Sequence, residues 1–260
     1  MIILCMGIFS ANCIIAQQPV LTNGLGMKFV LIKPGRMTVG KFQPTVGKTD
    51  FRGNPFTDKI NTAVTVASQK DAMPGFDVNI SKAFYIGMYE VTQEQWQKIM
   101  GSNPSFFKNI SSANKPVENI SWNDAQTFIK KLNTSEKKYL YRLPTEFEWE
   151  FAARAGAQDD ISWKDIQSSA VLGGEAPAIG GTKQPNAWGI YDMLGNVWEW
   201  VEDFYNEKLF ADPVPAKTGQ QHVLKGASFT GDVKNATYMT HAGGPGNGFD
   251  IGLRIVMQKK

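Results

Sequence analysis

Cysteine is almost absent from this chain: the only two in 260 residues are Cys5 and Cys13. Both lie in residues 1–16, an uncharged apolar run whose length suits the hydrophobic region of a secretory signal better than a membrane span. Cleavage after Ala16 would leave a mature chain without a thiol. Such a chain has no disulfide, no thiolate nucleophile and no cysteine metal site.

A strong charge of either sign is also missing. The chain has 27 basic and 24 acidic residues, giving a net charge of +3, and its lysines are scattered among acids. No basic stripe could follow a phosphate backbone, so nucleic acid is not an expected partner. No segment after residue 16 is apolar for long enough to span a bilayer. We expect an exported soluble protein, whether periplasmic, envelope-associated or secreted, with a lipid anchor at Cys13 as the alternative to cleavage.

Glycine and proline, in contrast, are frequent, with 25 and 13 copies, which predicts many turns. Apolar residues alternate in 26–40 and break at Pro34-Gly35, which predicts a hairpin. Residues 41–80 show no steady period and are expected to form an irregular loop with one strand at Thr62–Ala67. A further strand is predicted from Phe84 to Val91.

Three helices are predicted, each starting after a hydroxyl side chain that can cap it. Together with the short strands, they predict an α+β domain with low regular secondary structure. The helix signals are Thr92 with Gln95 before residues 93–100, Ser121 before an apolar face at Ala125, Phe128, Ile129 and Leu132, and Thr145 with Glu148 before a helix ended by Gly156.

The stretch from Asn186 to Tyr205 contains three of the seven tryptophans. From residue 197 its side chains alternate, which predicts a strand leaving a glycine turn. Asp192 and Glu199 flank that turn, and two carboxylates with backbone carbonyls on a tight loop are ligands that calcium accepts. The alternative is a structural turn in which the tryptophans are core and the acids face water.

Several motifs, taken in order, resemble the formylglycine-generating enzyme family, also called sulfatase-modifying factors. The resemblance runs from about residue 26 to residue 256 and implies one domain with a C-type-lectin-like core. The motifs are Tyr89-Glu90-Val91-Thr92, Tyr141-Arg142-Leu143-Pro144-Thr145-Glu146, Glu148-Trp149, the stretch 186–203, Gly226-Ala227-Ser228-Phe229 and Ile251-Gly252-Leu253-Arg254.

Active members of this family oxidise a cysteine of a sulfatase to formylglycine, using copper(I) held by two thiolates. By resemblance, the thiolate positions are Gly231 and Ala236 here. Copper(I) prefers sulfur ligands, so copper is not expected. Met193 and Met239 carry sulfur, but methionine as a core filler is the preferred interpretation.

The resemblance also implies a structural calcium ion held by Asp192, the carbonyls of Gly195 and Val197, and Glu199. Because the residue pattern points to the same site, calcium is preferred to a bare turn. A second calcium site common in the family is not expected, because Ser168-Ser169-Ala170 lacks its asparagine.

The remaining candidates for chemistry are sparse. His222 and His241 have no evident third metal ligand and are expected to be structural. Ser228, Asp232 and His241 are close in sequence, but no catalytic triad is predicted from them.

We therefore expect a non-oxidising member of this family, a pseudoenzyme with no catalytic residues. A groove near Trp198, Ser228 and the 230–248 loop would bind a peptide, a glycan or an envelope protein. One alternative is an oxidoreductase of the formylglycine-generating type, or another oxidation, that uses different ligands. Another is a structural subunit of an envelope complex.

Overall fold

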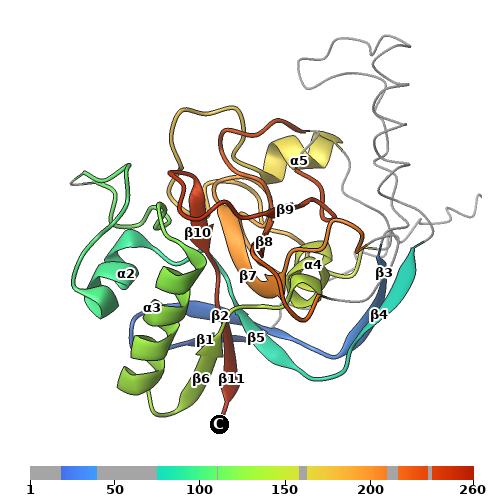
Figure 1. The fold of residues 1–260 in the computed structure, drawn as a ribbon, viewed down its shortest axis with the longest axis horizontal. Helices are drawn as coiled ribbons and strands as arrows, with labels where there is room; N and C mark the ends of the chain where they lie inside the picture. The colour runs from blue at the N-terminus through green and yellow to red at the C-terminus, as the bar shows by residue number, and fades with distance from the viewer. Residues whose placement is uncertain (1–18, 40–74, 110, 158–162, 210–215, 234–235) are drawn as a thin grey trace, which may run out of the picture.

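The computed structural model describes residues 19–39, 75–109, 111–157, 163–209, 216–233 and 236–260. The predicted leader and the predicted strand Thr62–Ala67 lie outside these residues. The α+β prediction is confirmed: short strands in three sheets are combined with four short helices in the described part of the chain (Figure 1).

The largest sheet has the strand order β1-β2-β5-β11-β6, and its neighbouring strands pair antiparallel. The last strand of the chain, β11, lies between β5 and β6. This sheet therefore joins the first strands of the domain to its last one. The bounds are β1 Val20–Thr22, β2 Lys28–Ile32, β5 Phe84–Gly87, β6 Tyr139–Arg142 and β11 Val256–Lys259.

The second sheet has the order β10-β7-β8-β9 and carries the tryptophan-rich stretch. β7 pairs in parallel with β10, with Trp198 opposite Ile251, and antiparallel with β8. The predicted strand after the glycine turn is thus confirmed as β7. The bounds are β7 Trp198–Phe204, β8 His222–Lys225, β9 His241–Gly243 and β10 Ile251–Leu253.

The predicted hairpin over residues 26–40 is wrong. The chain does break near Pro34, but β2 pairs with β1 and β5, whereas β3 (Gly35–Val39) pairs with β4 (Phe76–Ile80) in a separate two-stranded sheet. The Pro-Gly break therefore passes the chain from one sheet to another. Strand β4 also falls within the segment predicted to be irregular.

The three predicted helices are confirmed, and each begins with a capping box in which the hydroxyl accepts a backbone N–H. Helix α4 ends at Arg154, two residues before the expected glycine, because Ala155 already adopts a left-handed φ of 48°. Helix α5 was not predicted. The bounds are α2 Gln93–Met100, α3 Trp122–Ser135, α4 Glu146–Arg154 and α5 Trp163–Ser169.

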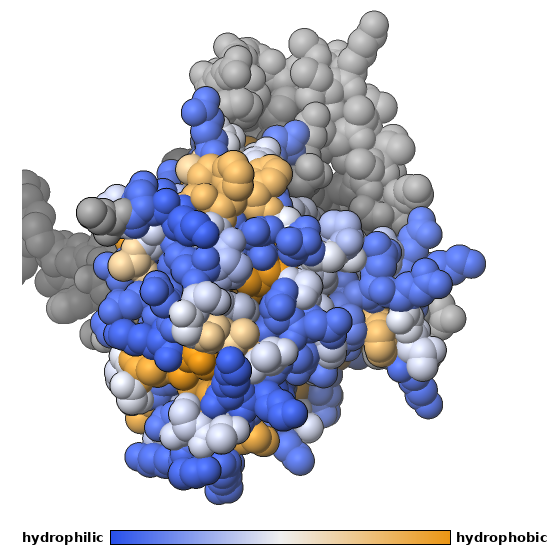
Figure 2. All heavy atoms as spheres, turned by 60° about the vertical axis from the view of Figure 1, so that its left-hand side comes forward, coloured by the Kyte–Doolittle hydropathy of each residue, from blue (hydrophilic) through white to orange (hydrophobic). Residues whose placement is uncertain are grey.

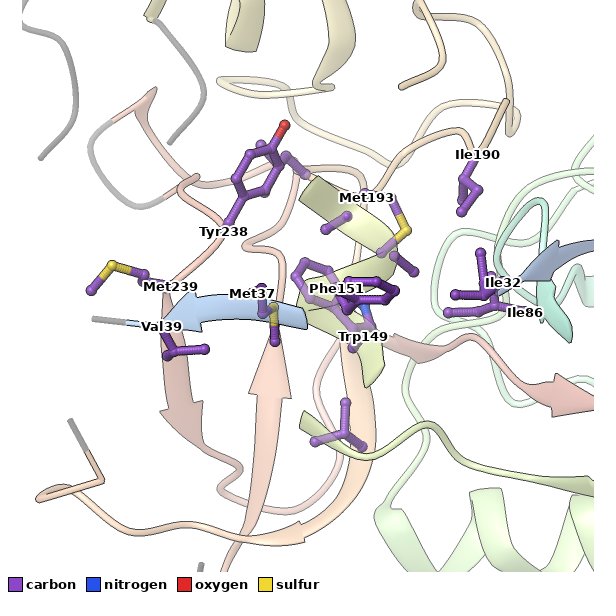
Figure 3. Close-up of a cluster of buried hydrophobic side chains, with 14 of the residues drawn as sticks. Ile32, Met37, Val39, Ile86, Trp149, Phe151, Ile190, Met193, Tyr238 and Met239 are labelled. Atoms are coloured by element: carbon purple, nitrogen blue, oxygen red, sulfur yellow. The ribbon is translucent and has the colours of Figure 1, made fainter. Parts of the chain in front are cut away.

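Two buried clusters hold these elements together. One lies around α3, β6 and β11 and includes Trp96 stacked on Phe128. The other surrounds α4, where Trp149 and Phe151 meet side chains of β3 and of the loop before β7, such as Met37 and Met193 (Figure 3). The core of the domain thus reaches the base of the β7–β10 pair, which carries the predicted site.

Candidate functional site

Two of the predicted calcium residues, Asp192 and Glu199, contact a buried arginine, Arg254. The guanidinium of Arg254 is fully buried and donates to both carboxylate oxygens of Glu199, with Nη2–Oε1 at 2.8 Å and Nε–Oε2 at 2.9 Å. Trp149 Nε1 donates to the same Oε2 at 2.7 Å. Arg254 also donates to the carbonyls of Gly87 and Tyr191. Glu199 therefore lies inside the core, bound by one cation and one indole.

Negative charge exceeds positive charge at this place. Three buried carboxylates, those of Glu90, Asp192 and Glu199, lie around the single guanidinium of Arg254. Burial, followed by the charges of Asp192 and Glu199, raises the pKa of Glu90 well above its ordinary value. Burial also raises the pKa of Asp192. A further cation would relieve this imbalance.

The donor set fits a hard cation in part. Asp192 accepts the N–H of Gly181 on Oδ2 at 2.6 Å, but its buried Oδ1 accepts no hydrogen bond from the described residues. The chain takes left-handed φ values at Asp192 (52°), Gly195 (80°) and Asn196 (59°), which define the tight turn. Glu199, in contrast, already accepts from Arg254 and Trp149, so it can serve a metal only if Arg254 gives up part of its contact.

The expected groove residues lie together around the start of β10. Ser228 Oγ donates to Asp250 Oδ2 at 2.7 Å, and Thr230 Oγ1 lies 3.2 Å from the same oxygen. The backbone of Asp250 accepts the N–H of Trp198 at 2.8 Å. Ser228 is completely buried, whereas Trp198 is half-buried. Ser228 therefore orients Asp250 rather than facing a ligand itself.

Gly231 adjoins this group. The N–H of Gly231 donates to the carbonyl of Ser228 at 2.9 Å, and a Cβ on Gly231 would meet that carbonyl at 3.1 Å. Ala236 is buried in the cluster against which Trp198 packs. Met193 and Met239 lie in that cluster too, as core side chains. The described residues contain no cysteine.

An aromatic surface that the sequence did not reveal lies beside Asp250. It consists of Phe106, Phe107, Phe229 and Phe249, whose ring centroids are 5.0–6.5 Å apart in the contacting pairs. Phe106 is 70% exposed and Phe249 is 49% exposed. Figure 2 brings the left-hand side of Figure 1 forward and shows hydrophobic side chains gathered in a few patches on a mostly hydrophilic surface.

Two adjacent residues, Glu118 and Asn119, form hydrogen bonds with the loops that carry the aromatic surface. Glu118 is fully buried, and its two carboxylate oxygens accept the N–H groups of Phe106 and Phe107, each at 2.9 Å. Asn119, with a left-handed φ of 63°, donates from its backbone to Gly248 and from its side chain to Pro104. This dipeptide joins the loop after α2 to the loop before β10.

A second buried ionic group lies at helix α4 and involves His241. Lys225 is fully buried, and its Nζ lies 3.3 Å from Glu150 and 3.7 Å from Glu146. Glu150 also pairs with Arg154, and Glu146 with His241 Nδ1 at 3.0 Å. Burial opposes the charge of Glu146, but His241 and Lys225 together lower its pKa. This group links α4 to β8 and β9 and has a structural role.

His222 is structural as well, as predicted. Its ring stacks on Trp122 with centroids 3.7 Å apart, and also on Phe204 at 4.3 Å. Among the described residues, no three histidine, cysteine or acidic side chains converge as a metal site. Ser228 donates to Asp250.

With this geometry in place, comparison with known proteins identifies the family. Residues 18–259 match the family model described as "Sulfatase-modifying factor enzyme 1-like domain". The chain belongs to this family. None of the helices in the described part of the sulfatase-modifying-factor domain is both long and apolar enough to cross a bilayer.

Individual relatives are about 30% identical to this domain over the residues that align. It is 30% identical to the "Chaperone protein LppX" of Paenibacillus barcinonensis, over 70% of this chain and 83% of that protein. It is 29% identical to the formylglycine-generating enzyme of Streptomyces coelicolor, over 61% of this chain and 55% of the enzyme. It is 33% identical to the mouse "Inactive C-alpha-formylglycine-generating enzyme 2", over 44% of this chain and 37% of that protein.

The fold agrees with a solved structure. "Treponema denticola variable protein 1" superposes with a TM-score of 0.65 and 25% identity, covering 92% of this chain and 98% of the other. The chain spans about half or less of the Streptomyces enzyme and the mouse inactive relative, although it spans most of the chaperone.

Proposed function

We propose that this protein is an exported, non-oxidising member of the sulfatase-modifying factor family that binds a polypeptide partner as an accessory protein. The observation that supports it most is the chemistry of Gly231 and Ala236, the positions that the family resemblance assigns to the copper-binding thiolates. Neither residue offers a ligand to copper(I), which prefers sulfur. The family contains a relative named as inactive and a relative named as a chaperone, and both roles are compatible with such a scaffold.

The surroundings of these two positions support binding rather than chemistry. The Ser228 hydroxyl is buried and committed to Asp250, so it is not placed to act on a ligand. Close by, the aromatic surface exposes two rings that soluble proteins usually bury. An exposed apolar surface on a rigid domain is suited to recognition.

The direct test is an oxidation assay. The purified protein is incubated with a cysteine-containing sulfatase peptide, copper(I) and oxygen, and aldehyde is detected by hydrazide labelling and mass spectrometry. We expect no aldehyde, whereas an active formylglycine-generating enzyme run in parallel should convert the peptide. Aldehyde formed by this protein would show that it is an oxidase with other ligands and would refute the proposal.

We also propose a structural calcium ion held by Asp192, the carbonyls of Gly195 and Val197, and Glu199. Two features of the described residues support it: the buried Oδ1 of Asp192 accepts no hydrogen bond from them, and carboxylates outnumber cations around Arg254. Bound there, calcium would fix the turn that leads into β7 and would compete with Arg254 for Glu199.

A further inference from the structure

We propose that the aromatic surface and the neighbouring carboxylate of Asp250 form a docking site for a polypeptide segment that places a basic side chain next to an apolar one. This proposal rests on the proposed function, because it takes a polypeptide as the partner. It specifies where on the domain that partner binds and which side chains the partner must present.

Hydrogen bonds to Glu118 and Asn119 fix the loops that carry the exposed aromatic rings. The N–H groups of Phe106 and Phe107 are both bound to the buried carboxylate of Glu118, which fixes the backbone of the loop that carries the exposed ring of Phe106. Phe249 is fixed from the other side, because the preceding Gly248 accepts the N–H of Asn119 at 2.9 Å. Loops whose backbone is fixed before binding lose little freedom when a partner docks.

The two loops are also tied to one another. Asn119 donates to the carbonyl of Pro104, and Asn247 donates to the side-chain oxygen of Asn119 at 2.9 Å. Phe106 and Phe249 therefore keep a defined separation, with ring centroids 6.5 Å apart and planes inclined by 56°. In Figure 1 these loops lie at the upper left, between α2 and β10. An aliphatic side chain of a partner can therefore lie against this pair of rings from outside.

The charged half of the site is Asp250, which directly follows Phe249. Its Oδ2 accepts from Ser228, and Thr230 lies within reach, but these hydroxyls bring no positive charge. Asp250 has no ion pair with the described part of the chain. Lys108, on the loop that carries Phe106, donates instead to the carbonyl of Asn103 at 3.2 Å.

Charge complementarity therefore identifies the partner. A carboxylate without a cation, next to exposed rings, favours a lysine or an arginine whose alkyl stem covers the rings while its head reaches the carboxylate. Arginine is the better fit, since its planar guanidinium pairs with carboxylates and also stacks on aromatic faces. The predicted partner segment thus combines leucine-like and arginine-like side chains.

The test uses three short fluorescent peptides, one of leucine and arginine, one of leucine and glutamate, and one of serine and arginine. Binding to the full protein is measured by fluorescence anisotropy. We expect the leucine–arginine peptide to bind about tenfold or more tightly than either other peptide. The double variant Phe106→Ser/Phe249→Ser should weaken its binding by about tenfold or more, as is usual for aromatic anchors.

Two further variants separate charge from structure. Asp250→Asn keeps an acceptor for Ser228 but removes the charge, so it should reduce the preference for the leucine–arginine peptide over the leucine–glutamate peptide. Leu140→Ser changes a side chain that is 45% exposed on β6, outside the aromatic surface, and should leave binding unchanged. Melting temperatures near that of the unchanged protein establish that each variant is folded.

Three results would overturn the docking proposal. The first is equal binding of all three peptides, or binding that survives the double variant. The second is concentration-dependent self-association that the double variant abolishes, which would make a second copy the occupant. The third is binding to phosphatidylglycerol vesicles, but not to the peptides, that depends on the same rings. Aldehyde in the oxidation assay would instead refute the non-oxidising function and leave the docking site intact.

Discussion

Replacing Asp203 with asparagine should stabilise this protein at neutral pH and have little effect in acid. Asp203 is half-buried near the end of β7, and its Oδ2 accepts the N–H of Glu146, the first residue of α4, at 2.6 Å. Burial raises the pKa of Asp203 from 3.8 to about 6; the hydrogen bond from Glu146 opposes this rise and the charge of Glu146 adds to it. Asparagine keeps an acceptor oxygen for the helix end but carries no charge.

The sign follows from proton linkage. The folded state binds the Asp203 proton more tightly than the unfolded state, so stability is greatest below pH 3.8 and is lost as the pH rises through about 6. At 1.36 kcal/mol for each pH unit, the full loss is about 3 kcal/mol, as an upper bound. The asparagine variant escapes this loss, so its advantage should grow from near zero at pH 3.5 to about 3 kcal/mol above pH 6.5.

The assay is urea denaturation across that pH range for the unchanged protein and Asp203→Asn. Glu90, Glu118 and Asp192 also have raised pKa values, but they are common to both proteins and cancel in the difference. The matched control is Glu175→Gln, which alters an exposed acid whose charge does not act on Asp203 and should give a flat difference. A difference for Asp203→Asn that does not change with pH would refute the reasoning.

Three other perturbations give distinct outcomes. Chelation of calcium should lower the melting temperature, and Glu199→Ala should abolish that shift. A melting temperature that is the same with and without chelator would refute the proposed calcium site. The double variant Gly231→Cys/Ala236→Cys should gain copper(I) binding in a competition assay with bicinchoninate, whereas each single variant should not; no gain would mean that these positions do not correspond to the thiolates. Lys225→Met leaves Glu146 without its lysine partner and should cost about 3–5 kcal/mol in urea denaturation, whereas a loss below about 1 kcal/mol would be typical of an exposed pair.

The elements that could be predicted from the sequence are those whose signals are local. The capping boxes at Thr92, Ser121 and Thr145 each lie within four residues, and all three helices begin where they predict. The hairpin over residues 26–40 failed because a Pro-Gly break has the same pattern whether the chain turns back or passes to another sheet. Which strand β3 pairs with is decided by β4, about 40 residues further along the chain.

Contacts between residues far apart in the sequence also limited what could be predicted of the candidate site. Asp192 and Glu199 stood out because they flank a visible turn, but the partner of Glu199 is Arg254, which is 55 residues away. Glu118 was missed, although an acid between the apolar residues of the Pro116–Ile120 stretch is a weak sign of a buried carboxylate. Its function depends on where the loop after α2 lies, and the local pattern does not contain that information.

One short strand, β10, links the buried charge cluster around Arg254 to the docking surface at Asp250. β10 ends next to Arg254, which binds Glu199 of β7 in the core, and it begins next to Asp250, whose carbonyl accepts the N–H of Trp198 of β7. The parallel pairing of these strands therefore fixes Asp250 and the preceding Phe249 relative to the buried charge cluster. Because three residues of strand separate the core contact from the surface contact, any ion that orders the turn before β7 would also order the docking surface. Calcium would then act on partner binding through the backbone, without touching the partner.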